Sequence, residues 1–63
     1  MYRAYARILD REYQCIVYIG LATTFDELCS SADWRRVNRQ ARRMAKAFTS
    51  HDCVLDGIEW RVE

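Results

Sequence analysis

The chain has 63 residues, of which 51% are hydrophobic and 30% are charged, and its formal net charge is +1. This length predicts a single domain over residues 1–63, and two Trp, four Tyr and two Phe argue against an intrinsically disordered chain. Pro is absent and Gly occurs only twice, which excludes long flexible linkers and glycine-rich phosphate loops.

The sequence predicts a cytoplasmic protein. No stretch is apolar over the roughly 18 residues that a membrane-spanning helix needs. The first residues, MYRAYARILD, alternate in polarity and lack the apolar segment of a secretory signal. Cys15, Cys29 and Cys53 are odd in number and lack paired spacing, which argues against a disulfide framework. Cys15 is expected to be a small core residue.

Residues 2–9 and 13–20 alternate between polar and apolar side chains, which is typical of two β-strands. The short polar break between them predicts a hairpin. Their apolar faces coincide if Ile8 lies opposite Cys15 and Ala6 lies opposite Val17. The opposite face of the hairpin then carries Arg3, Tyr5, Arg7, Gln14, Ile16 and Tyr18.

The segment TTFDELCSS predicts a short helical turn after the hairpin. Thr23 with Asp26, or Thr24 with Glu27, has the spacing of a capping box. In that motif the first side chain accepts a hydrogen bond from a backbone N–H three residues later. Either pair would therefore start the turn.

The main helix is predicted from about residue 31 to about residue 48, with Ser30 and Asp33 as a second capping pair at its start. Its apolar residues recur at intervals of three and four and fill an arc roughly 80° wide. They are Trp34, Val37, Ala41, Met44 and Phe48. Six cations occupy an arc of roughly 120° on the other side. These cations are Arg35, Arg36, Arg39, Arg42, Arg43 and Lys46.

Residues 54–63 alternate again and predict a third strand, beside either the first or the second. The sequence thus predicts an α+β fold: a small two-layer ββαβ domain with a three-stranded, mainly antiparallel sheet and one main amphipathic helix. The expected core consists of Ile8, Val17, Trp34, Val37, Met44, Phe48, Ile58 and Trp60.

The six cations of the helix are the strongest functional signal. Charged helix faces are often merely solvated, but such helices usually pair Glu with Lys, whereas here like charges at i,i+4 weaken the helix. Planar guanidinium groups suit phosphate or carboxylate. We therefore expect a non-enzymatic binding protein whose helix docks on an acidic surface, with nucleic-acid phosphates as the first candidate.

Two observations keep an alternative partner open. A pI near 7.7 lies below the value of about 9 that usually marks a nucleic-acid-binding domain. A compact chain with one strongly charged face and no catalytic apparatus also suits a stoichiometric inhibitor or adaptor, of the type found in phages and mobile elements, that binds an acidic surface of a host protein.

A second candidate face is the outer side of the hairpin. Its members are Arg3, Tyr5, Arg7, Ile16 and Tyr18. Exposed aromatic and cationic residues on a sheet suit base stacking, and an apolar face also suits a homodimer interface. Because this face and the helix are expected on opposite sides of the domain, one nucleic-acid strand would not easily contact both.

Catalytic chemistry is not expected. His51 is the single histidine, so no second His can complete a site. Cys29, His51 and Cys53 supply three ligand atoms without the paired C-x-x-C spacing of a zinc site. No catalytic residue, metal site or cofactor is therefore expected.

Overall fold

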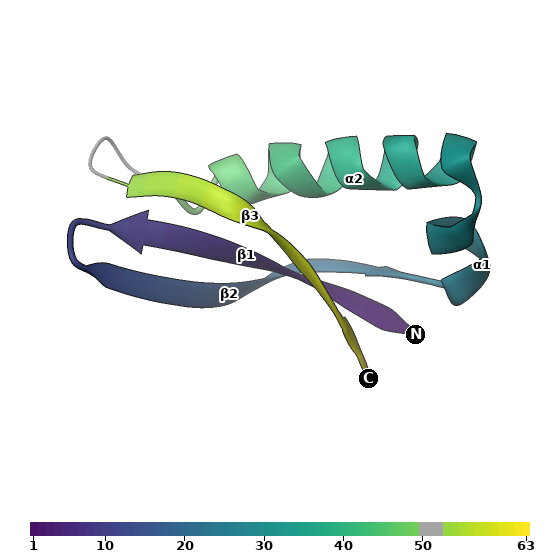
Figure 1. Cartoon of the computed structure of the whole chain (residues 1–63), viewed down its shortest axis with the longest axis horizontal. Helices are drawn as coiled ribbons and strands as arrows, with labels where there is room; N and C mark the ends of the chain where they lie inside the picture. Colours follow the sequence, from purple (N-terminus) through teal and green to yellow (C-terminus); the bar gives the residue numbers. More distant parts are fainter. Residues whose placement is uncertain (50–52) are drawn as a thin grey trace.

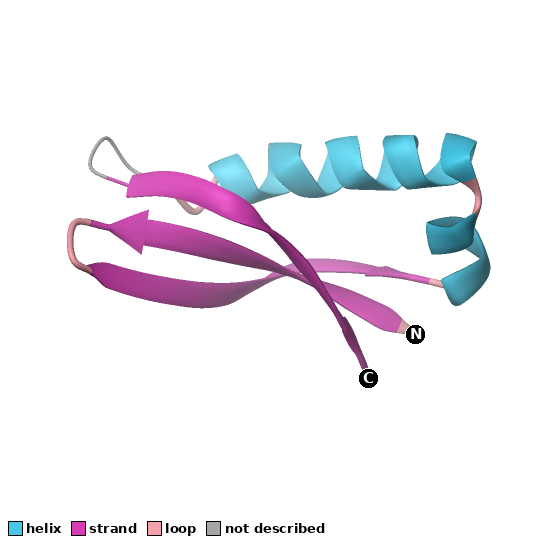
Figure 2. Ribbon diagram, viewed as in Figure 1, coloured by secondary structure: helices cyan, strands magenta, loops and turns pink. Residues whose placement is uncertain are grey.

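The computed structural model describes residues 1–49 and 53–63. One layer is a sheet and the other is the helix α2, which lies along one side of that sheet (Figure 1). Figure 2 shows the short helix α1 at the end of the sheet where β2 finishes. In chain order the elements are β1 (Tyr2–Asp10), β2 (Tyr13–Thr23), α1 (Phe25–Cys29), α2 (Ser31–Lys46) and β3 (Cys53–Val62). The predicted α+β fold with the order ββαβ is confirmed.

The sheet is antiparallel throughout and has the order β2-β1-β3. The third strand therefore pairs with the first strand, which resolves the two alternatives left by the sequence. The expected hairpin register is also confirmed, because Ile8 lies opposite Cys15 and Ala6 lies opposite Val17. The turn of the hairpin contains Arg11, whose φ of 57° lies in the left-handed region that few residues other than glycine adopt.

A bulge in β2 lengthens that strand without changing which side chains face the helix. From Tyr18 to Ala22 the strand advances four residues, opposite an advance of two on β1. Gly20 lies in this segment with a φ of 85°, which glycine adopts readily because it has no Cβ. Since an insertion of two residues preserves the alternation, Ile19 and Thr23 are both buried.

A second bulge in β3 has the opposite effect on alternation. Between Leu55 and Gly57 this strand advances two residues while β1 advances one, so Asp56 is the extra residue. An insertion of one residue reverses the side-chain alternation. Both Leu55 and Ile58 consequently pack against the core.

The core is built from short side chains at the contact between β1 and α2. Its buried hydrophobic residues are Ala4, Ala6, Ile8, Ile19, Val37, Ala41 and Ala45. Alanines on both elements allow the helix to lie close to the central strand. Burial was predicted correctly for Ile8 and Val37. Partial burial is found for four further predicted core residues, Val17, Met44, Ile58 and Trp60.

Three residues predicted to be in the core are exposed instead. Trp34 is 38% exposed and Phe48 is 48% exposed, and Cys15 is exposed as well. Phe48 lies beyond the end of α2 at Lys46, so it no longer follows the apolar stripe of the helix. Cys15 is one of the first four residues of the edge strand β2, which are all exposed because one helix does not cover a three-stranded sheet.

The start of α2 also differs from expectation in one detail. Ser30 occupies the N-cap position, as predicted, but its side chain makes no capping hydrogen bond. A backbone hydrogen bond from the Trp34 N–H to the Ser30 carbonyl, 2.7 Å long, closes the first turn. The helix therefore begins at the predicted place without the predicted side-chain cap.

Candidate functional site

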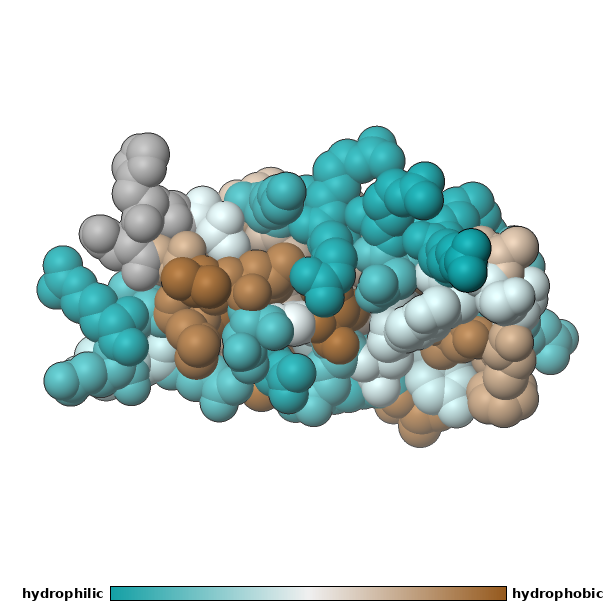
Figure 3. All heavy atoms as spheres, turned by 45° about the horizontal axis from the view of Figure 1, so that its top comes forward, coloured by the Kyte–Doolittle hydropathy of each residue, from teal (hydrophilic) through white to brown (hydrophobic). Residues whose placement is uncertain are grey.

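The basic face of α2 is defined as its six cationic residues, Arg35, Arg36, Arg39, Arg42, Arg43 and Lys46. All six are exposed. Figure 3 shows hydrophilic side chains gathered over α2, beside a strip of hydrophobic surface. The basic face extends about 16 Å along the helix, since eleven steps of about 1.5 Å separate its first and last residues. With Asp33 as the one acid of α2, six cations minus one carboxylate leave a charge of +5, so the rest of the chain carries −4.

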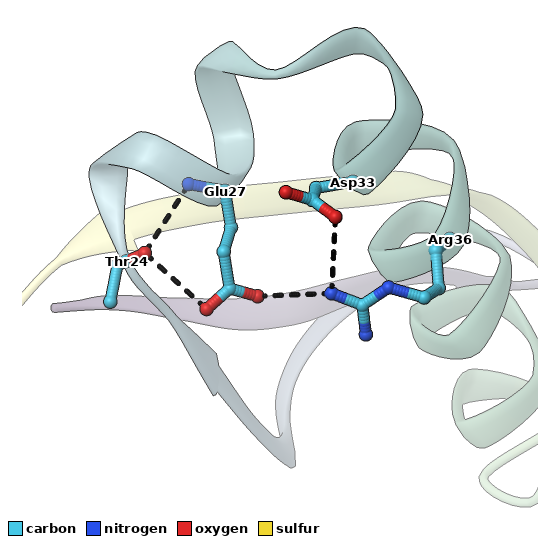
Figure 4. A network of polar contacts seen from close by, with 4 residues as sticks. All are labelled: Thr24, Glu27, Asp33 and Arg36. Carbon is cyan, nitrogen blue, oxygen red and sulfur yellow. Dashed lines mark hydrogen bonds and ion pairs between the residues drawn. The ribbon is translucent and has the colours of Figure 1, made fainter.

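Arg36 is the one member of the basic face held by carboxylates among the described residues. Its Nη2 atom lies 3.3 Å from Glu27 Oε2 and 3.6 Å from Asp33 Oδ1 (Figure 4). Glu27 is itself held by Thr24, because its backbone N–H donates to Thr24 Oγ1 over 3.2 Å and the Thr24 hydroxyl donates back to Glu27 Oε1 over 3.3 Å. Of the two capping pairs expected for the short helix, Thr24 with Glu27 is therefore the one that forms. Arg36 consequently connects α2 to α1.

The other five cations of the basic face have no ion pair with any residue in 1–49 or 53–63. Within the described residues, three like-charge pairs at helical i,i+4 spacing therefore have no compensating carboxylate: Arg35–Arg39, Arg39–Arg43 and Arg42–Lys46. The opposite stripe, with Val37, Ala41 and Ala45 buried, holds the helix in place despite this repulsion. The five cations are thus exposed and available to an anion.

The outer sheet face, on the side away from α2, has a different electrostatic character. Each of its three arginines is paired with a carboxylate: Arg3 with Glu63, Arg7 with Asp56 and Arg61 with Glu59. The hydrogen bond and the charge of Glu63 raise the pKa of Arg3 above its ordinary value, so this guanidinium stays charged. Within the described residues, the three pairs leave this face without excess positive charge.

The aromatic rings of the outer sheet face are partly covered by its own cations. The ring centroids of Tyr5 and Tyr18 lie 5.5 Å apart. The guanidinium carbon of Arg3 lies 5.3 Å from the Tyr18 centroid, and that of Arg61 lies 4.8 Å from the Tyr5 centroid. These cation–π contacts occupy ring surface that a nucleic-acid base would need. The outer sheet face is therefore less suited than α2 to a polyanion, and a homodimer through it stays a prediction.

The sequence pattern does not predict a ring contact at the start of α2 between the exposed Trp34 and the half-buried Trp60. The ring centroids of Trp34 and Trp60 lie 6.3 Å apart at an interplanar angle of 57°. Trp34 comes directly before Arg35 and lies within the apolar arc, between Ala41 and Ala45 in angle, at the first turn of the helix. The cation that follows Trp34 in sequence is the one feature of the sequence that indicates an exposed position. The spacing of Trp34 from Val37 and Ala41 fits the buried stripe, and the sequence pattern therefore predicts a core residue.

The remaining candidate residues form no further site in the part of the chain that is described. No group of three or more His, Cys, Asp or Glu residues there could hold a metal ion, and His51 lies outside the described residues. Neither helix within residues 1–49 and 53–63 has the length and apolarity that a membrane crossing requires. No protein-family model, curated protein or solved structure matches this chain. Its function must therefore be inferred from its own residues.

Proposed function

We propose that this is a non-enzymatic nucleic-acid-binding protein that places the basic face of α2 on the phosphate backbone. One observation carries this proposal: five of the six cations are exposed on one helix face and lack internal carboxylate partners among the described residues. The arginines of the outer sheet face, in contrast, are each paired. This segregation concentrates uncompensated positive charge on α2, where it repels itself unless an anion is bound.

The residue types on the basic face fit phosphate better than an isolated carboxylate. Guanidinium groups donate in a planar fork, and several of them along about 16 Å of helix can contact successive phosphates. Contacts to phosphate carry no base information, so this interaction is expected to be largely independent of sequence. A cytoplasmic location fits such a role.

An acidic surface on a host protein is the alternative partner. The net charge of +1 and the pI near 7.7 favour it, since a protein almost neutral overall gains little long-range attraction to nucleic acid. In that case the protein would act as a stoichiometric inhibitor or adaptor through the same cations.

The test is the salt dependence of binding to a generic DNA duplex. Each phosphate contact contributes about −0.9 to the slope of log K against log salt concentration, so the five cations should give a slope between about −3 and about −4.5. Arg39→Gln should reduce the steepness of the slope by about 0.9. Arg11→Asn removes an exposed cation from the hairpin turn and should leave the slope unchanged. Absence of binding to both duplex and single-stranded DNA at low salt would exclude nucleic acid and leave the acidic host protein.

A further inference from the structure

We infer that the basic face takes single-stranded nucleic acid in preference to duplex, with an unpaired base stacked on Trp34 and neighbouring phosphates held by Arg35 and Arg42. This inference rests on the proposed function and specifies its ligand. Three features carry it: the exposure of Trp34, its ring contact with Trp60, and its position on the same helix as cations without an ion pair in residues 1–49 and 53–63.

Trp34 is placed to present an aromatic surface to solvent. It lies in the first turn of α2 and is 38% exposed, although it belongs to the apolar stripe. Its partner Trp60 comes from the edge strand β3 and is half-buried against the core. The ring of Trp60 therefore packs against one part of the Trp34 ring, while another part of the Trp34 surface stays accessible to solvent. A partly exposed ring that already packs against a neighbour is suited to stacking, because it loses less conformational freedom on binding than a fully solvated side chain.

Two cations that lack an ion pair among the described residues lie near Trp34 on the helix or along its ridge. Arg35 follows it directly, and the ridge Trp34, Asn38, Arg42 advances by about 40° at each step of four residues. The ridge thus leads from the aromatic pair to the basic face. An aromatic platform next to backbone-binding cations is the arrangement by which single strands are bound without sequence preference.

The aromatic pair favours an unpaired base over the other occupants of an exposed apolar surface. In a duplex the base faces are covered by their neighbours, so a tryptophan ring can stack only on an unpaired base. A second copy of this chain that met the aromatic pair about a two-fold axis would bring the basic faces of the two copies together. That contact would repel, whereas a polyanion would neutralise the same charges.

The direct test is the intrinsic fluorescence of the unmodified protein. Trp34 and Trp60 are its two tryptophans, so the emission reports on the proposed site. Titration at low salt with a twelve-nucleotide oligothymidine should quench this emission, with the midpoint obtained from the anisotropy of a labelled strand. An oligouridine of the same length should behave in the same way, because stacking and phosphate contacts do not distinguish the two sugars.

A pair of variants separates stacking from charge. Trp34→Leu retains an apolar contact with Trp60 but removes the stacking surface, and it should weaken single-strand binding on the order of tenfold. Trp34→Phe retains a ring and should lose less. Neither variant should change duplex affinity.

Three results would overturn this inference and leave the proposed function intact. The first is saturable single-strand binding without any change in emission. The second is an equal loss of single-strand and duplex binding in Trp34→Leu. The third is an emission change on dilution of the protein alone, which would show that a second copy covers the aromatic pair. Failure to bind either form of nucleic acid at low salt would instead contradict the proposed function itself.

Discussion

The two glycines stand in different surroundings. Gly20 has a φ of 85°, and a Cβ built on it would meet nothing within 4 Å. Gly57 has an ordinary backbone conformation, but a Cβ there would lie 2.9 Å from Nη2 of Arg7. The obstacle at Gly20 is therefore the backbone conformation itself, whereas at Gly57 it is the end of a flexible side chain.

Substitution of these glycines should therefore have unequal effects on stability. Gly20→Ala should lower the free energy of unfolding by about 1–2 kcal/mol, because a side chain in the left-handed region clashes with its own backbone. Gly20→Asn should lose less, since Asn tolerates that region. Gly57→Ala should stay within about 0.5 kcal/mol, as Arg7 can move aside and alanine suits a strand better than glycine. Urea denaturation measures all three, and an unchanged Gly20→Ala would mean that the bulge is not required.

At the scale of elements, the contact between α2 and the sheet depends on alanine. Ala4 and Ala6 of β1 and Ala41 and Ala45 of α2 are all fully buried. Larger side chains at these positions would separate the two layers. This explains why the bulky Trp34 and Trp60 lie at the margin of the helix.

Enlarging one of these alanines should destabilise the domain. Ala41→Leu should cost about 1–3 kcal/mol, because the extra volume forces the helix away from β1. Ala32→Leu is the matched control, since Ala32 lies on the same helix and is exposed. The control should stay within about 0.5 kcal/mol. Equal losses in thermal or urea unfolding of the two variants would contradict the close packing of α2 on the sheet.

The strands, the main helix and the hairpin register could be predicted because each depends on periodicity along the chain. The bulge at Gly20 could not, since an insertion of two residues leaves the alternation of side chains intact. The exposure of Cys15 and Trp34 could not be predicted either. It depends on where the helix lies across the width of the sheet, and a one-dimensional pattern does not contain that position.

At the scale of the whole molecule, five cations without ion pairs among the described residues lie on α2, whereas the arginines of the outer sheet face are paired with carboxylates. The basic face could be predicted because its residues lie close together in sequence. The pairing on the outer sheet face could not, since Arg3 and Glu63 meet only when β1 and β3 lie side by side. The same holds for Arg36 and Glu27, which meet at the corner between the two helices. Three-dimensional neighbours thus decide which cations are structural and which remain available.

The double variant Arg39→Glu with Arg43→Glu tests whether the available cations serve binding and not the fold. Neither residue has an ion pair within residues 1–49 and 53–63. A glutamate at position 39 would face Arg35 and Arg42 at helical spacing, and each favourable pair contributes roughly 0.2–0.5 kcal/mol. The variant should therefore melt at the original temperature or slightly above it, while nucleic-acid binding falls sharply because attractions become repulsions.

Arg36→Glu, on the same face of the helix, should by contrast lower the stability of the fold. It would place a third carboxylate beside Glu27 and Asp33, where the original guanidinium holds both. Because these pairs are exposed, the expected loss of stability is modest, up to about 1 kcal/mol. Thermal melts and anisotropy titrations on both variants measure the two quantities separately. A lower melting temperature with unchanged binding in the double variant would mean that Arg39 and Arg43 support the fold. It would contradict the proposal that the basic face of α2 is a binding surface.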